Sequence, residues 1–158
     1  MAIVTDYPTP LFLDTNVFIV GAALESSPER MILNWVGYEG NRIADVENIL
    51  SDVLTTEIRW VARRLQHKDW AGEILQRIWK GMNVRYVVVD EHKWDALEEQ
   101  NRLPREDIGV YLSALAGNAS CFVSANHELI RDAAAQTERF TCMTPEAFVA
   151  TYVAQASR

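Results

Sequence analysis

The chain has 158 residues, 49% of them hydrophobic and 23% charged, which is the composition of a globular protein that buries a core without disulfides. Its net charge of −7 argues against a broad basic face for nucleic acid, although a local basic patch or metal ions in an acidic pocket would still accommodate a phosphate chain. The apolar runs are too short to cross a membrane and residues 1–10 lack the features of a signal peptide, so we expect one cytoplasmic domain over residues 1–158.

Apolar periodicity and capping residues divide the chain into alternating strands and helices. The first apolar run stops at Asp14, which is typical of a buried parallel strand with a ligand site beyond its carboxyl end. This alternation predicts an α/β fold with a mostly parallel sheet and right-handed crossovers. In chain order we predict a strand at 11–13, helices from 17 and at 28–36, a strand at 49–51, helices from 52 and at 69–82, a strand at 84–89, helices at 91–100 and 105–116, a strand at 120–124, a helix at 128–135, a strand at 140–143 and a C-terminal helix from 145.

Capping and burial patterns support these boundaries. The predicted N-caps are Ser27, Ser51, Asp90 and Thr144. The helix after Ser51 has a predicted core-facing stripe that leaves Glu57 outside it and consists of Leu54, Ile58, Val61 and Leu65. Elsewhere we expect core packing for Trp79 and Trp94, and buried free thiols at Cys121 and Cys142, whose spacing is not that of metal ligands.

Three acids occupy comparable places in these elements. Asp14 follows a predicted strand, Glu57 lies in the helix capped by Ser51, and Asp107 lies in the first turn of another helix. Taken singly, Asp107 would interact with the helix dipole and Glu57 would be a solvated helix position.

Together with their neighbours, these acids resemble the PIN-domain ribonucleases, the family that includes VapC-type toxins. The resemblance runs along nearly the whole chain, through the segments Leu13–Asn16, Leu50–Ile58, Arg105–Ala116, Val123–Leu129 and Thr144–Phe148. It implies a PIN-like three-layer α/β/α domain that cleaves RNA, forms a homodimer and leaves 5′-phosphates. For a member that is the toxin of a toxin–antitoxin pair, it also implies a cognate antitoxin protein.

The fourth acidic position departs from the family pattern. Asn126 stands where members commonly have an acid, and Glu128 substitutes for it only in part. An asparagine still offers a carbonyl oxygen to a hard cation, but it removes one negative charge, so the number of bound metals, one or two, stays open. We interpret the neighbouring His127 as a surface residue.

Clustered carboxylates suit the chemistry of phosphodiester cleavage because they bind Mg²⁺ or Mn²⁺, which activate water and stabilise the leaving oxygen. We therefore assign Asp14, Glu57 and Asp107 as metal ligands, directly or through water, with Asn126 as a weaker auxiliary ligand. The residues expected to orient them by hydrogen bonds are Thr15, Asn16 and Ser124. For Asn16 and Ser124, a turn or cap role is an equal alternative.

Substrate contacts are less clearly marked. Arg64 and Lys68 lie seven and eleven positions beyond Glu57, so on one continuous helix they would share its face and line a groove for RNA. A solvated charged face is an equal alternative for both, and for Arg59 and Arg63, which add local charge. Exposed tryptophans among Trp60, Trp70, Trp79 and Trp94 would stack on unpaired bases or form a subunit interface.

Two other functions were weighed against a ribonuclease. One is a PIN-fold module, weakened at Asn126, that binds RNA or protein without turnover. The other is an aspartyl-phosphate enzyme with Asp14 as nucleophile, but such enzymes that resemble haloacid dehalogenases have a second aspartate two residues on, where this chain has Asn16. The three retained acids favour the metal-dependent enzyme.

Overall fold

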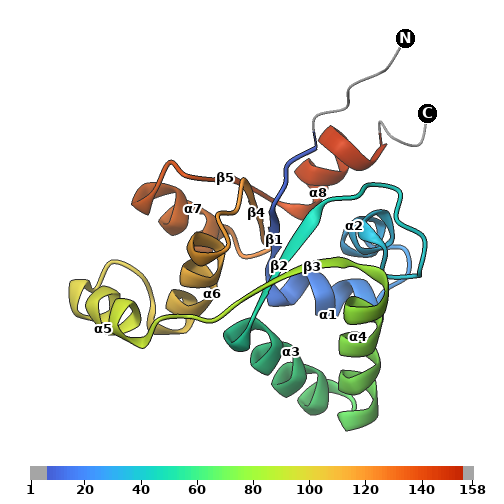
Figure 1. Cartoon of the computed structure of the whole chain (residues 1–158), viewed down its shortest axis with the longest axis horizontal. Helices are drawn as coiled ribbons and strands as arrows, with labels where there is room; N and C mark the ends of the chain where they lie inside the picture. The colour runs from blue at the N-terminus through green and yellow to red at the C-terminus, as the bar shows by residue number, and fades with distance from the viewer. Residues whose placement is uncertain (1–6, 155–158) are drawn as a thin grey trace.

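A computed structural model describes residues 7–154, and at its centre lies a five-stranded parallel sheet with helices around it (Figure 1). The strands are short and pair in the order β3-β2-β1-β4-β5, each pair parallel. The predicted α/β class with a parallel central sheet is therefore confirmed. The strand bounds are β1 Leu11–Leu13, β2 Glu47–Ser51, β3 Asn83–Val87, β4 Cys121–Val123 and β5 Thr141–Met143.

The helices follow the predicted order closely. Their bounds are α1 Thr15–Ala23, α2 Pro28–Val36, α3 Asp52–Leu65, α4 Lys68–Gly81, α5 Glu91–Gln100, α6 Arg105–Ala116, α7 His127–Gln136 and α8 Pro145–Phe148, which continues into a π-helical turn at Val149–Val153. The predicted N-caps form, with Ser27, Ser51, Asp90 and Thr144 each accepting a backbone N–H. Within residues 7–154, no helix has both the length and the apolar character needed to cross a membrane.

The order of the strands determines where a ligand site belongs. From β1 the chain builds outward through β2 to β3, and it then returns to add β4 and β5 on the other side of β1. Right-handed crossovers place the connecting helices of these two halves on opposite faces of the sheet. Their loops diverge between the carboxyl ends of β1 and β4, which is the usual ligand position in an open α/β sheet.

The core centres on β1 and β4, whose residues are all buried. Phe12 stacks on Phe122 across this strand pair, with ring centroids 5.1 Å apart, and Phe122 stacks in turn on Phe140 at 5.4 Å. Near the other end of the chain, Phe148 packs edge-on against the buried Trp35 at 5.6 Å. The strands that carry the candidate site thus lie within the buried core.

Several burial predictions were wrong at helix ends. Leu65 is 64% exposed, because it is the last residue of α3, and Ala62 is buried in the turn before it. Trp79 is 52% exposed and lies against Tyr86, with ring centroids 5.8 Å apart. The buried face of α4 contains Ile78, and the next residue is rotated by about 100° away from it.

Other predictions of burial were confirmed. Trp94 is partly buried against the core, as expected, although α5 contains no fully buried residue. Both cysteines are free thiols: Cys121 is buried and Cys142 is partly buried. Strand β3 ends at Val87 rather than at residue 89, because the Val89 N–H donates to the Asp52 carboxylate at 3.1 Å and leaves the sheet.

Candidate active site

Asp14 lies directly after β1, at the point where the two halves of the sheet diverge. Its backbone N–H donates to the Val123 carbonyl at 2.9 Å, which extends the pairing of β1 with β4. Its side chain is buried, and Oδ1 caps α1 by accepting the Thr15 N–H at 2.8 Å. Oδ2 accepts the Ser124 hydroxyl at 2.7 Å and the Asn16 amide at 3.1 Å. The carboxylate is therefore held in one orientation by residues that follow β1 and by a residue that follows β4.

Asn16 and Ser124 form the rest of this hydrogen-bond network. The Asn16 amide also donates to Ser124 Oγ at 3.2 Å, and Asn16 Oδ1 accepts the Ala125 N–H at 3.1 Å. Ser124 Oγ in turn accepts the Asn126 N–H at 3.0 Å. Both side chains orient Asp14 and both also stabilise the turn after β4, so the two roles considered for them coexist.

A second hydrogen-bonded pair links the helices that present Glu57 and Asp107. The buried hydroxyls of Ser51 and Ser113 lie 2.7 Å apart. Ser113 donates to the Gly109 carbonyl at 2.8 Å, and Ser51 Oγ accepts the Leu54 N–H at 2.9 Å, so Ser51 is the donor between the two hydroxyls. This contact connects the start of α3 to α6. The sequence marked Ser51 as a cap but gave no signal for Ser113.

A pocket of about 380 Å³ opens among α1, α3, α6 and the start of α7. Its apolar floor and walls come from Ile19, Val20, Val61 and Val110. Its polar lining consists of Asp14, Thr15, Asn16, Glu57, Glu106, Asp107 and Asn126. All four residues predicted to bind metal thus line one pocket, and we call it the acidic pocket. Ser124 supports Asp14 from outside this lining.

Burial raises the pKa of each of the three carboxylates, and like charges add to the rise at Glu57 and Asp107. At Asp14 burial alone raises the pKa, and the hydrogen bonds from Ser124, Thr15 and Asn16 oppose the rise. At Glu57 burial is again the largest cause, followed by repulsion from Asp14 and, more weakly, from Asp107. Burial and then Glu106 raise the pKa of Asp107 to about 6, with Asp14 contributing further repulsion. The mutual repulsion shows that the carboxylates share one electrostatic environment.

The acidic pocket has the donor chemistry of a hard-cation site. Among residues 7–154, no Lys, Arg or His forms an ion pair with Asp14, Glu57 or Asp107. The buried Thr15 Oγ1 lies close enough to Glu57 to oppose the rise of the Glu57 pKa. Within residues 7–154, however, this hydroxyl has no partner at hydrogen-bonding distance and angle. Carboxylate, amide and hydroxyl oxygens are the ligands that Mg²⁺ and Mn²⁺ prefer.

The carboxylates are nevertheless not gathered into a closed metal cage. Over residues 7–154, no three His, Cys, Asp or Glu side chains are close enough together to hold an ion by themselves. Mg²⁺ commonly binds through one or two carboxylates and keeps several waters or substrate oxygens. The spacing therefore fits a cation held partly through water, and it fits poorly a cation held by protein ligands alone.

Asn126 has a structural role at the fourth position. It is the N-cap of α7, and its Oδ1 accepts the Leu129 N–H at 3.1 Å. One lone pair of that oxygen is thus already used. Acids that the sequence reasoning left unassigned supply charge nearby, since Glu106 lines the pocket and Asp132 and Glu128 both raise the pKa of Asp107.

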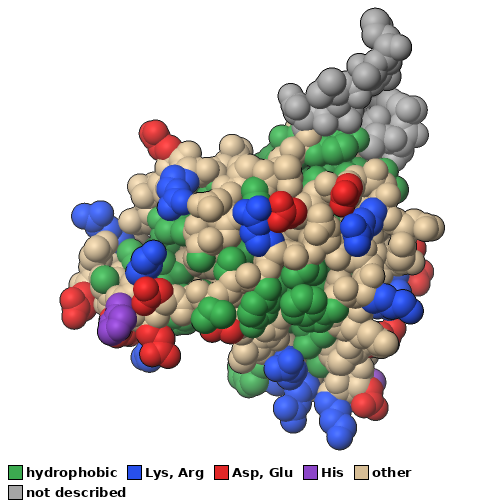
Figure 2. Space-filling view, in the orientation of Figure 1, with side chains coloured by type: hydrophobic (Ala, Val, Ile, Leu, Met, Phe, Trp, Pro, Cys, Tyr) green, Lys and Arg blue, Asp and Glu red, His purple; other side chains and the backbone are tan. Residues whose placement is uncertain are grey.

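The prediction that Lys68 continues the face of Glu57 was wrong. Helix α3 ends at Leu65, and His67 caps a new helix by accepting the Trp70 N–H at 3.2 Å, so Lys68 begins α4. Arg64 does belong to α3, and its guanidinium lies over the Trp60 ring, 4.6 Å from the centroid. On the face shown in Figure 2, basic side chains gather over the far ends of α3 and α4. Neither Arg64 nor Lys68 lines the acidic pocket.

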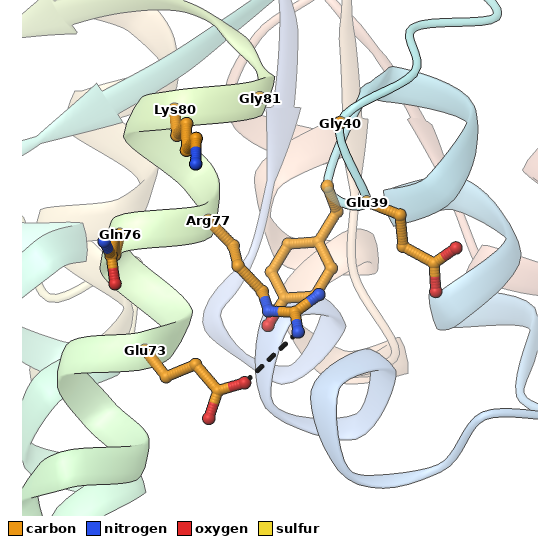
Figure 3. A pocket seen from close by; sticks show the side chains of 8 residues that line it. Glu39, Gly40, Glu73, Gln76, Arg77, Lys80 and Gly81 are labelled. Atoms are coloured by element: carbon orange, nitrogen blue, oxygen red, sulfur yellow. Dashed lines mark ion pairs between the residues drawn. The ribbon is translucent and has the colours of Figure 1, made fainter.

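A larger pocket of about 540 Å³ lies between α4 and the turn after α2, and both of its acidic side chains are paired (Figure 3), while Lys80 in its lining forms no ion pair within residues 7–154. Arg77 forms an ion pair with Glu73 at 3.3 Å and extends over the Tyr38 ring, 5.5 Å from its centroid. Glu39, also in its lining, pairs with Arg30 at 2.9 Å. This paired pocket shares no lining residue with the acidic pocket.

Comparison with known proteins identifies the fold. No family model and no curated protein sequence matches the chain. Among solved structures, VapBC2 from Rickettsia felis bound to a promoter DNA fragment superposes with a TM-score of 0.60 at 11% identity, covering 85% of this chain and 97% of that one. VapBC-1 from nontypeable Haemophilus influenzae gives 0.56 at 19% identity, over 86% and 98% of the two chains. PAE2754 from Pyrobaculum aerophilum gives 0.54 at 13% identity, over 94% and 90%.

These similarities show that the fold of this chain is PIN-like and VapC-like. The predicted resemblance is thereby confirmed at the level of the fold.

Proposed function

We propose that this protein is a metal-dependent endoribonuclease that hydrolyses phosphodiester bonds in RNA. The observation that carries the proposal is the acidic pocket, where Asp14, Glu57 and Asp107 line one opening without a basic partner among residues 7–154. Buried carboxylates that repel one another lower the stability of the fold, and a bound cation removes that repulsion. A PIN-like, VapC-like fold supports a nuclease over other phosphate chemistry.

The roles of the residues follow from their positions. Asp14, fixed by Ser124 and Asn16, is the most rigid ligand, and Glu57 and Asp107 complete the set from α3 and α6. Asn126 offers a weaker oxygen, and Thr15 has a free hydroxyl in the pocket lining. When bound there, Mg²⁺ or Mn²⁺ would activate a water for attack on phosphorus and stabilise charge on the leaving oxygen.

The similar VapBC structures suggest a biological setting. Both are named as complexes, and one of them includes promoter DNA. By analogy, we propose that this protein is the toxin of a type II toxin–antitoxin pair, that it binds a cognate antitoxin protein, and that it works as a homodimer. The acidic charge of the chain, −7, suits a partner with a basic segment.

One observation favours a second candidate, a PIN-fold module that binds RNA or protein without turnover. Asn126 stands where the family commonly has an acid, and its side-chain carbonyl already caps α7. Both facts weaken the fourth candidate ligand of a metal ion in the acidic pocket. This candidate predicts RNA or protein binding that does not depend on a divalent ion.

Incubation of purified protein with mixed single-stranded and structured RNA, with Mg²⁺ or Mn²⁺, tests the proposal. We expect cleavage that EDTA abolishes and that Asp14→Asn abolishes. A wild-type preparation that leaves the RNA intact with every divalent ion tried, as Asp14→Asn does, would leave the binding module as the better description.

A further inference from the structure

Next to the acidic pocket lies a second opening with a different lining. It measures about 490 Å³ and is lined mainly by apolar side chains from α3 and α5. Its lining residues are Asp52, Val53, Thr56, Glu57, Trp60, Trp94 and Glu106. Glu57 and Glu106 line both pockets, so the two openings share a wall. We call this second opening the tryptophan pocket.

We propose that the tryptophan pocket seats one unpaired base of the RNA substrate and favours a base that carries an amino group. The proposal rests on the proposed function, because it places this base beside the phosphate that the acidic pocket would cleave. The occupant is thus a nucleotide of single-stranded RNA, with its base in the tryptophan pocket and its phosphate toward the acidic pocket.

Trp60 has the geometry of a stacking platform. It is 58% exposed although it lies in the middle of α3, and it follows Glu57 by one helical turn. Arg64, one turn further, lies over the indole at 4.6 Å and brings a positive charge to the same face. Base stacking on an aromatic ring combined with a nearby cation is the usual way in which proteins hold single-stranded nucleic acid.

Trp94 forms the opposite wall and is itself held in place. It is partly buried, and its ring lies so close to Gly109 that a Cβ at residue 109 would come within 2.7 Å of it. The glycine lets α6 approach the ring, which fixes the width of the pocket between α3 and α5. A base that enters therefore meets one exposed aromatic side chain and one that is held in place.

The carboxylates of Asp52, Glu57 and Glu106 are the strongest hydrogen-bonding groups of the tryptophan pocket and they only accept, whereas the Thr56 hydroxyl also donates. Asp52 uses Oδ1 for the Val89 N–H, and the Glu106 side chain forms no ion pair or hydrogen bond within residues 7–154. A carboxylate accepts from an exocyclic amino group, as it does from cytosine N4. A carbonyl at the same ring position, as in uracil, would face the carboxylate as a second acceptor. Cytosine and adenine are therefore favoured over uracil and hypoxanthine.

Binding of labelled RNA octamers to Asp14→Asn protein with Mg²⁺ tests this inference without cleavage. The probes are two matched pairs, oligocytidylate with oligouridylate and oligoadenylate with oligoinosinate, measured by fluorescence anisotropy. We expect the amino-bearing member of each pair to bind at least fivefold more tightly. Adding Trp60→Ala should weaken its binding roughly tenfold, since a stacked base contributes about that much or more. Trp79→Ala, which removes an exposed tryptophan of another pocket, is the matched control and should leave binding unchanged.

Three results would overturn the inference: a Trp60→Ala effect no larger than that of Trp79→Ala, equal binding within both pairs, or conversion of a dimer to a monomer by Trp60→Ala with RNA binding intact. The last result would mean that a second copy covers the pocket.

Cleavage by the wild-type protein, measured on the same octamers, separates the two proposals. If the wild-type protein cleaves the octamers and Trp60→Ala does not weaken RNA binding, only the proposal of a base in the tryptophan pocket is wrong. If the wild-type protein binds RNA through Trp60 but does not cleave it, only the proposed nuclease activity is wrong.

Discussion

The acidic pocket and the paired pocket are both lined by charged side chains, but the acids of only one of them have basic partners. In the paired pocket, Glu73 meets Arg77 and Glu39 meets Arg30. In the acidic pocket, burial raises the pKa of Asp14, burial and like charges raise the pKa of Glu57 and Asp107, and no basic side chain of residues 7–154 pairs with them. The acids of the larger pocket are thus neutralised by basic side chains of the protein itself, whereas those of the smaller pocket can be neutralised only by a bound cation.

A matched pair of substitutions should give the largest difference between the two pockets. Glu57→Gln removes a proposed ligand and should lower RNA cleavage roughly 1,000-fold, equivalent to about 4 kcal/mol of transition-state stabilisation. Glu73→Gln makes the same chemical change on α4 and should leave cleavage unaltered, with a loss of stability of about 0–1 kcal/mol from its partly exposed ion pair. Equal effects of the two variants on the cleavage rate would remove the distinction.

The folding of Glu57→Gln should not suffer in the absence of metal. Repulsion from Asp14 and Asp107 already disfavours the charge of Glu57, so the neutral amide relieves it. We therefore expect a free energy of unfolding equal to that of the wild type or higher. A large loss of stability would instead mean that the lower activity is a folding effect.

Magnesium should stabilise the protein through the acidic pocket. At about 100 times its dissociation constant, Mg²⁺ should add ~2.7 kcal/mol to the free energy of unfolding, or roughly 5–10 °C in the melting temperature. Removal with EDTA should reverse the shift, and Asp14→Asn should abolish most of it. A shift of the same size in Asp14→Asn would place the ion elsewhere.

The contact between Ser51 and Ser113 should account for a smaller effect on stability. Ser113→Ala leaves the buried Ser51 hydroxyl without its acceptor and should cost about 1–3 kcal/mol, measured by urea unfolding. Because this contact links α3 to α6, we also expect weaker Mg²⁺ binding. The exposed Ser26→Ala is the matched control and should be neutral.

The smallest effect concerns pH. The pKa of Asp107 rises from 3.8 to about 6 in the folded protein, so the folded state binds this proton more tightly than the unfolded state does. The metal-free protein should therefore lose stability as pH rises from about 4 to about 6 and gain it as pH falls. Asp107→Asn should flatten this dependence without removing the contributions of Asp14 and Glu57. An unchanged slope in the variant would show that Asp107 titrates normally.

Local patterns in the sequence predicted the elements well because caps and periodicity act within a few residues. Ser27 and Asp90 marked the starts of α2 and α5 correctly. Asp14 was placed beyond the carboxyl end of a parallel strand, where ligand sites lie, and Asn126 was assigned to the same site by the family resemblance; both line the acidic pocket. The site residues that could be predicted are those that follow directly from this rule or from the family resemblance.

What could not be predicted depends on contacts between distant segments. Lys68 continued the spacing from Glu57, although a new helix was already predicted from residue 69, and the His67 cap shows that this helix begins at Lys68 itself. Ser113 looked like an ordinary helix residue until α6 met Ser51. Trp79 was assigned to the core together with its neighbour Ile78 on an amphipathic helix, whereas its burial depends on which face of α4 meets the rest of the protein.

The hydrogen bond between Ser124 and Asp14 joins residues that are 110 positions apart. During synthesis, a chain that has emerged from the ribosome only as far as α6 already contains the three acids but still lacks β4, which pairs with β1 and brings Ser124 to Asp14. The acidic pocket is therefore complete only when most of the protein has been made. If the pocket cleaves RNA as proposed, a partly synthesised chain is harmless to the messenger that encodes it, and activity begins with the folded domain.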